Sequence, residues 1–220
     1  MRSVIFDLDG TLVDTAVDLI VAANACFRDM GHRDLLDPDT DRATAVRGAK
    51  AMLRLGFSRL GPVDEALVSA QFDPLLACYR AAIDVHSRFY PGALVAAGAL
   101  RARGIAVGIA TNRPYDLADL LLLRLGAWDA FGPVVGADTL PVRKPDPAHF
   151  WEAVDRAGGD RCRALLVGDT ATDRETARAA GVPSVLVGFG PAGGEVRRLK
   201  PEAVLAEYGD LPDLAERLLV

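Results

Sequence analysis

The sequence predicts an α/β fold in which helices flank a parallel sheet, with an inserted helical cap domain. Two observations carry this prediction. Short apolar runs rich in β-branched residues alternate with helical patterns through most of the chain, and one long stretch near the N-terminus lacks such runs. Such alternation is typical of parallel strands connected by covering helices. With 220 residues, half of them apolar, the chain can bury one large core or two small ones.

The expected strands are short, and each is bounded by residues that favour turns. They cover Val4–Phe6, Ile105–Ala110, Leu165–Val167 and Ser184–Val187. Three helices are expected in the same part of the chain, each followed by a glycine suited to a helix C-terminus. They span Tyr115–Leu125, His149–Ala157 and Arg174–Ala180, with Gly126, Gly158 and Gly181 as the stops.

The stretch from about Thr15 to Phe89 breaks this rhythm, because it contains helical patterns and no convincing strand. Its helical segments are Val17–Met30, Thr44–Leu55 and Val63–Ile83. We therefore expect a helical cap domain at residues 15–90 and an α/β core domain formed by residues 1–14 and 91–220. The cap is expected over the carboxyl ends of the strands, where open α/β sheets bind ligands.

Charge and cysteine content narrow the class of protein. The formal net charge of -5 provides no field that attracts polyanions, so nucleic acid is not an expected partner. The three cysteines have no CxxC spacing, which argues against a disulfide framework and a zinc site. No apolar run is long enough for a membrane span or a signal peptide. We expect a soluble, cytoplasmic protein without membrane partners.

The segment Asp7–Asp14 begins where the first expected strand ends. Side chains alternate along an extended chain, so Asp7 and Asp9 fall on one side of the backbone. Like charges at one place cost stability, which favours a chemical role over the alternative of an acidic turn that ends a strand. The pair is therefore a candidate for catalysis.

A second acidic motif, Gly168–Asp173, follows another expected strand and adds Asp169 and Asp173 to the same edge of the sheet. Four carboxylates with no neighbouring His or Cys suit a hard divalent cation, Mg²⁺ before any other. The alternative is that this motif only supplies an Asp or Thr cap for the helix near Arg174.

Two further motifs supply groups that can hold an anion. Thr111 and Asn112 end the strand Ile105–Ala110, where a hydroxyl and an amide can donate hydrogen bonds, although such residues also serve in ordinary turns. Lys144 precedes a turn fixed by Pro145, and its ammonium can balance a substrate phosphate. The alternative for Lys144 is a solvated loop residue.

In this order the motifs resemble the four motifs of the haloacid dehalogenase superfamily, and the helical insertion resembles that superfamily's first class of cap. The matching segments are Asp7-x-Asp9-Gly10-Thr11, Thr111-Asn112, Lys144-Pro145 and Gly168-Asp169-x-x-x-Asp173. The resemblance implies a Rossmann-like core and a magnesium-dependent phosphatase that works through a phospho-aspartyl intermediate.

The resemblance also implies a role for each motif residue. Asp7 would be the nucleophile and Asp9 the general acid and base. Mg²⁺ would be held by Asp7, the backbone carbonyl of Asp9, and Asp169, with support from Asp173. Thr111, Asn112 and Lys144 would hold the phosphoryl oxygens. An acid at Asp9 disfavours a dehalogenase, because a halide leaves without a proton whereas an alkoxide needs one.

Two other segments, Arg88–Gly92 and Asp138–Pro147, resemble the phosphoglycolate phosphatase branch. Sugar phosphates, N-acetylmuramate 6-phosphate and pyrophosphate remain alternative substrates. In the cap, Arg47 and Lys50 fall in the segment that resembles the substrate-specificity loop, where they can meet a substrate carboxylate or a second phosphate. The alternative is that both are cations on a helix surface. Phosphonate cleavage through a Schiff base on Lys50, and a binding module without catalysis, are the remaining alternatives. We expect a small-molecule phosphomonoester as partner, and a monomer or small homo-oligomer.

Overall fold

The structure is a computed structural model that describes residues 1–219, and the chain divides into two compact units. Unit 1 consists of Met1–Val13 together with the described residues from Phe89 onward. Unit 2 is the continuous segment Asp14–Arg88. Two short strands, β2 (Val13–Asp14) and β3 (Arg88–Phe89), pair with each other where the chain leaves and returns to unit 1.

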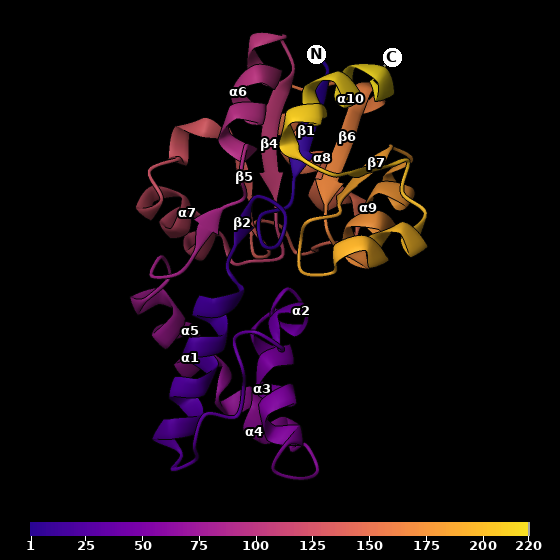
Figure 1. Ribbon diagram of the computed structural model, residues 1–220. Coiled ribbons are helices and arrows are strands. Elements are labelled where there is room, and N and C mark those ends of the chain that lie inside the picture. The colour runs from indigo at the N-terminus through magenta and orange to yellow at the C-terminus, as the bar shows by residue number, and fades with distance from the viewer. Residues whose placement is uncertain (220) are drawn as a thin grey trace. The chain divides into compact units, whose positions relative to one another are not determined.

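Unit 1 contains a six-stranded sheet in the order β5-β4-β1-β6-β7-β8, with all neighbouring strands parallel (Figure 1). The strands are β1 (Ser3–Phe6), β4 (Ala106–Ala110), β5 (Val134–Val135), β6 (Ala164–Gly168), β7 (Ser184–Val187) and β8 (Ala203–Leu205). The four expected strands and the α/β fold are confirmed. The patterns did not predict β5 and β8, which are too short to show a periodicity.

Helices cover this sheet, as the alternating pattern predicts. They are α6 (Ala93–Ala102), α7 (Tyr115–Arg124), α8 (Pro147–Arg156), α9 (Ala171–Ala180) and α10 (Leu211–Leu218), with short 3₁₀ turns at Trp128–Ala130, Arg161–Arg163, Gly193–Leu199 and Tyr208–Asp210. Helices α8 and α9 begin two and three residues earlier than expected, because the side chains of Asp146 and Thr170 cap their first turns.

The central strand β1 buries both faces, so alternate residues enter two different cores. Ile5 belongs to a cluster that includes Phe150 of α8 and Ala177 of α9. Phe6 points to the opposite face and meets Phe131 edge to face, with 6.0 Å between ring centroids. Burial on both faces fixes the position of β1 in the sheet, and with it the point at which the residues after Phe6 leave the sheet.

Unit 2 is helical, with α1 (Ala16–Asp29), α2 (Arg42–Ala45), α3 (Ala49–Ser58), α4 (Glu65–Ala70) and α5 (Phe72–Ala81). Two expected helices are each divided. Gly48 adopts a φ of 89° and separates α2 from α3. Pro74 has no N–H to continue a helix from α4, and its ring would clash with the carbonyl of Ala70, so the chain starts again as α5.

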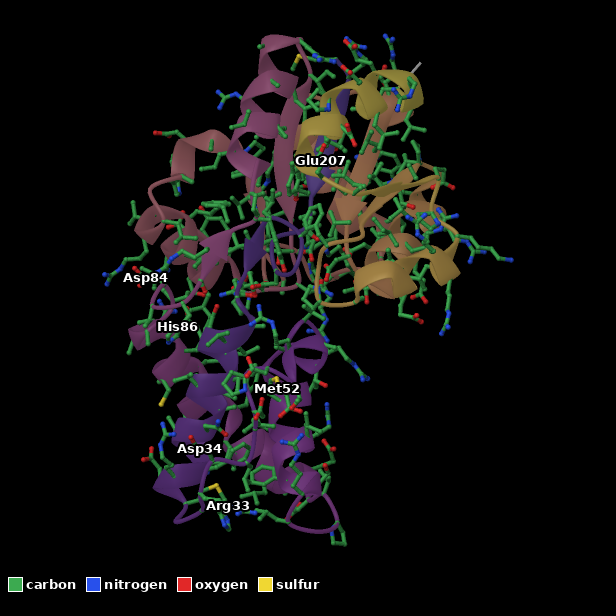
Figure 2. The ribbon with its side chains drawn as sticks, viewed as in Figure 1. Arg33, Asp34, Met52, Asp84, His86 and Glu207 are labelled. Atoms are coloured by element: carbon green, nitrogen blue, oxygen red, sulfur yellow. The ribbon has the colours of Figure 1, made fainter. Side chains whose placement is uncertain are left out.

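The core of unit 2 forms where α1 packs against α3 and α5. Met52 is fully buried among these helices (Figure 2), and Phe27 meets Phe57 edge to face at 5.2 Å. Near the end of the unit, the buried carboxylate of Asp18 accepts hydrogen bonds from the backbone N–H groups of His86 and Ser87. Among the described residues, no helix is long and apolar enough to cross a bilayer.

Candidate active site

Three neighbouring strands of unit 1 end at the polar residues singled out from the sequence. Strands β4, β1 and β6 lie side by side in the sheet (Figure 1). Asp7 follows β1, Thr111 follows β4, and Asp169 follows β6, so all three residues lie at the carboxyl edge of the parallel sheet. The backbone ladder continues past the strand ends, since Asp7 N–H donates to Val167 O at 2.8 Å and Thr111 N–H donates to Val135 O at 2.9 Å. The sheet therefore fixes the backbone that carries these side chains.

Three carboxylates gather at this edge. Asp7, Asp169 and Asp173 are all buried, and each offers an oxygen within 4.8 Å of the others. Asp173 reaches the group from the first turn of α9, where its Oδ2 accepts from the Thr170 N–H at 3.0 Å and from the Thr170 hydroxyl at 2.6 Å. Asp173 therefore takes part both in the cap of α9 and in the carboxylate cluster, so the cap alternative and the cluster prediction do not exclude each other.

Lys144 supplies a buried positive charge within this cluster. Its Nζ lies 2.6 Å from Asp173 Oδ1 and 2.8 Å from Asp7 Oδ1, and its side chain is 2% exposed. Asn112 donates through Nδ2 to the backbone oxygen of Lys144 at 2.9 Å, which joins the loop after β4 to the loop before α8. The solvated-loop alternative for Lys144 is wrong, because this lysine is paired and buried.

The electrostatics of the cluster follow from burial and from these contacts. Burial raises the pKa of Asp7 to about 7, with Asp173 and Asp9 acting in the same direction and Lys144 opposing. Burial and the neighbouring carboxylates also raise the pKa of Asp169 well above its ordinary value. Burial alone would raise the pKa of Asp173 too, but Lys144 and Thr170 hold it low. Lys144 stays protonated, because its two carboxylate partners raise its pKa despite its burial.

The donor set fits a hard divalent cation. Thr11 Oγ1 donates to Asp169 Oδ1 at 3.1 Å, whereas the buried Asp169 Oδ2 has no hydrogen-bond partner. A buried carboxylate oxygen without a partner is costly, and here it lies beside two further carboxylates. Oxygen-only ligands of this kind suit Mg²⁺.

The sequence predicts that four carboxylates converge. Among the described residues the cluster contains three, and Asp9 is not one of them. The Asp9 side chain is 22% exposed and forms a two-point ion pair with Arg113, in which Arg113 Nε lies 3.0 Å from Asp9 Oδ2 and Nη2 contacts Oδ1. Sequence reasoning missed Arg113. The only signal was a basic residue directly after Thr111 and Asn112.

Residues from the C-terminal part of the chain support the loop after β1, and sequence reasoning missed these as well. The buried Tyr208 hydroxyl donates to Thr11 O at 2.8 Å. A side chain at Gly190 would place its Cβ 2.7 Å from Gly10 O, so this position requires glycine. The Tyr208 hydrogen bond holds the loop that follows Asp9, and Gly190 allows the chain to pass close to it.

The two cap candidates lie in unit 2 and are exposed. Arg47 lies in the turn between α2 and α3. Lys50 lies in the first turn of α3, with its Nζ 5.0 Å from the ring centroid of Phe72. These positions do not test whether either residue contacts a substrate. Their role in substrate binding stays a prediction.

Clustered carboxylates and a hydroxyl at the carboxyl edge of a parallel sheet, with a buried ammonium among them, form an arrangement suited to an enzyme that acts on anionic substrates. A family model described as haloacid dehalogenase-like hydrolase matches residues 1–181. The chain belongs to this family, and it is an enzyme of the family's phosphatase branch. The resemblance stated from the motifs is thereby confirmed.

Individual relatives agree with this placement, and a solved structure shares the fold. Phosphoglycolate phosphatase of Rhodospirillum rubrum is 38% identical over 219 residues, covering 96% of this chain and 90% of the relative. Phosphoglycolate phosphatase of Mesorhizobium japonicum is 37% identical, covering 98% and 96%. The crystal structure of a predicted phosphoglycolate phosphatase from Haemophilus somnus shares the fold, with a TM-score of 0.84, 23% identity and 97% of each chain covered.

Proposed function

We propose that this protein hydrolyses a small phosphomonoester, 2-phosphoglycolate, in a magnesium-dependent reaction through a phospho-aspartyl intermediate on Asp7. The observation that carries the proposal is the buried Lys144 ammonium, 2.8 Å from Asp7 within a group of carboxylates. A carboxylate approaches a phosphate dianion only where cations offset the repulsion. The names of the relatives that are 36–38% identical support the choice of substrate.

In the first step, an oxygen of Asp7 attacks phosphorus and the bond from phosphorus to the leaving oxygen breaks. Asp9 donates its proton to that oxygen, so the leaving group departs with a hydroxyl group instead of an alkoxide. Lys144, together with Thr111 and Asn112, would hold the phosphoryl oxygens. The product of this step is an aspartyl phosphate on Asp7 and an Asp9 carboxylate.

In the second step, the Asp9 carboxylate accepts a proton from a water molecule whose oxygen attacks the same phosphorus. The bond between phosphorus and Asp7 breaks and inorganic phosphate leaves. Asp7 returns as a carboxylate and Asp9 as an acid, so the site is ready for the next substrate. Asp9 thus serves as acid in one step and as base in the other.

The cation would be held by Asp7, the backbone carbonyl of Asp9 and Asp169, with Asp173 in support. When bound, Mg²⁺ offsets the charge on the phosphoryl group and polarises its oxygens. The fit rests on the oxygen-only cluster and on the partnerless Asp169 Oδ2.

Selection of the substrate is proposed to lie in unit 2, which we take as the cap. The phosphoryl-binding residues meet a group that all candidate substrates share, so discrimination requires contacts to the leaving portion. Arg47 and Lys50 are the proposed contacts there. The cytoplasmic location and the monomeric or small homo-oligomeric state stay predictions.

The test is phosphate release from a panel of small phosphomonoesters with Mg²⁺, using wild type and Asp7→Asn. We expect 2-phosphoglycolate to be hydrolysed fastest and Asp7→Asn to be inactive while its fold stays intact. Asp129→Asn, an exposed position outside the site, is the matched control and should retain activity. Sugar phosphates, N-acetylmuramate 6-phosphate or pyrophosphate outrunning phosphoglycolate would overturn the substrate, and an active Asp7→Asn would overturn the mechanism.

A further inference from the structure

Arg113 reaches Asp9 from a backbone that is fixed on both sides. Its N–H donates to Thr111 Oγ1 at 3.1 Å, and its carbonyl accepts from the Ala137 N–H at 2.8 Å. Its side chain is only 8% exposed. The guanidinium therefore starts from a rigid point at the end of β4 and extends to Asp9 with little freedom to move elsewhere.

The contact between Arg113 and Asp9 uses both carboxylate oxygens. Nε lies 3.0 Å from Oδ2, and Nη2 contacts Oδ1. A planar guanidinium that binds a carboxylate at two points fixes the orientation of the carboxylate as well as its place. The Asp9 side chain is 22% exposed, and this two-point pairing restricts its orientation.

In its carboxylate form, which acts as the base in the second step, Asp9 lies near further negative charge. Asp7, which contributes to the cluster of three carboxylates, lies two residues away, and like charges repel. Lys144 does not perform this task, since its ammonium is bound to Asp7 and Asp173. Arg113 is a cation that the structure places on Asp9.

We infer that Arg113 is a positioning residue for Asp9. It holds the Asp9 carboxylate apart from the group formed by Asp7, Asp169 and Asp173, and directs it toward the space in which the leaving oxygen and the attacking water must lie. This inference rests on the proposed function, in which Asp9 is the acid and then the base. The competing role is direct contact between Arg113 and the substrate.

The first experiment compares wild type with Arg113→Met and Arg113→Lys on two substrates. An alkyl phosphate such as 2-phosphoglycolate needs the acid, whereas p-nitrophenyl phosphate has a leaving group that departs without it. For Arg113→Met we expect roughly a hundredfold loss of kcat/KM on the alkyl phosphate, the size of effect that a misplaced general acid produces. The first-turnover burst of p-nitrophenolate should stay near the wild-type rate, followed by slow steady-state turnover.

The Arg113→Lys variant should fall between wild type and Arg113→Met, because one ammonium keeps the charge but loses the second contact. If Arg113→Met proves unstable, Arg113→Lys replaces it in the test, provided that its melting temperature matches that of wild type. Arg161→Met is the matched control, since Arg161 also forms a two-point pair, with Asp155, but on the surface. The inference would be overturned if the burst rate with p-nitrophenyl phosphate fell as far as kcat/KM on the alkyl phosphate, or if neither quantity fell.

A double-mutant comparison separates action through Asp9 from contact with the substrate. If Arg113 acts through Asp9, then Asp9→Asn and Asp9→Asn with Arg113→Met should dephosphorylate at the same rate after a p-nitrophenyl phosphate burst. A further loss in the double variant assigns Arg113 to the substrate and overturns the inference. If Asp7→Asn is inactive and Arg113→Met keeps wild-type activity, the inference is rejected and the proposed function stands. If Asp7→Asn is active, the proposed function is rejected and this inference with it.

Discussion

The ammonium of Lys144 lies 2.6 Å from Asp173 Oδ1, and the two side chains are 2% and 1% exposed. The pair joins the loop before α8 to the first turn of α9, so one contact ties together two elements that follow different strands. Removing one member of a buried ion pair leaves the other charge without compensation. This contact is therefore structural as well as electrostatic.

Lys144→Met should destabilise the protein and abolish activity together. We expect the free energy of unfolding to fall by roughly 3–5 kcal/mol, because Asp7 and Asp173 lose their shared cation. Urea denaturation in the presence of a chelator measures the change. Lys200→Met, an exposed lysine, is the control and should change stability little. A loss confined to activity would show that the pair does not stabilise the fold.

Without a divalent cation, stability should decrease as pH rises between the ordinary aspartate value of 3.8 and about 7. Burial raises the pKa of Asp7 and of Asp169, so the folded protein keeps protons that the unfolded chain has already released. Stability then falls with pH, by about 1.4 kcal/mol per pH unit for each proton retained. The effect of Asp7 flattens above about 7.

The measurement is chemical unfolding across that range in chelator, for wild type and Asp7→Asn. The variant carries no carboxyl group at this position, so its stability should depend less steeply on pH. Wild-type stability that instead rises through the range would mean that Lys144 outweighs burial at Asp7.

The site could be predicted from the sequence where a side chain follows directly from a strand end. Asp7, Thr111 and Asp169 leave β1, β4 and β6 at the same edge, and parallel pairing alone brings them together. The fold was predictable for the same reason, since four strands carry continuous apolar runs. β5 has only two residues, which is too few for any pattern.

The Arg113–Asp9 pair could not be predicted, because it depends on side-chain directions across 104 residues of sequence. The same is true of Tyr208, whose hydroxyl reaches Thr11 from the far end of the chain. The division of the expected helix at Gly48 needed the backbone torsion, because glycine is also tolerated inside helices. The periodicity of apolar residues therefore does not predict long-range side-chain contacts or the torsion angles of single residues.

Gly168→Ala should damage the site through Asp173. A Cβ at residue 168 would lie 2.4 Å from the Cβ and Cγ of Asp173, so the carboxylate must move. We expect a stability loss of about 1–3 kcal/mol from overpacking, accompanied by a large loss of kcat. Thermal melting and steady-state kinetics measure the two effects. Gly98→Ala is the control, because that position in α6 has open space and alanine favours a helix.

Removal of divalent cations should abolish turnover, and Mg²⁺ should restore it, whereas Ca²⁺ should not. Calcium has a larger and looser coordination shell, which allows both oxygens of Asp7 to bind it and leaves none for attack. Phosphate release is followed after chelation and after each metal is returned. Full activity with Ca²⁺ would contradict the assignment of Asp7 as both ligand and nucleophile.

Arg47→Ala should separate recognition of the substrate from the chemistry. Arg47 is exposed in the turn between α2 and α3, and the proposal gives it the carboxylate of 2-phosphoglycolate. Losing a charged hydrogen-bond pair costs roughly 1.5–3 kcal/mol, which corresponds to about ten- to a hundredfold in kcat/KM. p-Nitrophenyl phosphate has no carboxylate, so its hydrolysis should change little.

The control for this variant is Arg54→Ala, which removes an exposed arginine of α3 that pairs with Glu65 at 2.7 and 2.8 Å. Arg54→Ala should leave the ratio of kcat/KM for the two substrates unchanged, because that guanidinium is already bound to a carboxylate within unit 2. If both substrates lose activity equally in Arg47→Ala, Arg47 supports folding or chemistry instead of recognition. If neither loses activity, the carboxylate is bound elsewhere, and Lys50→Ala is the next variant to measure.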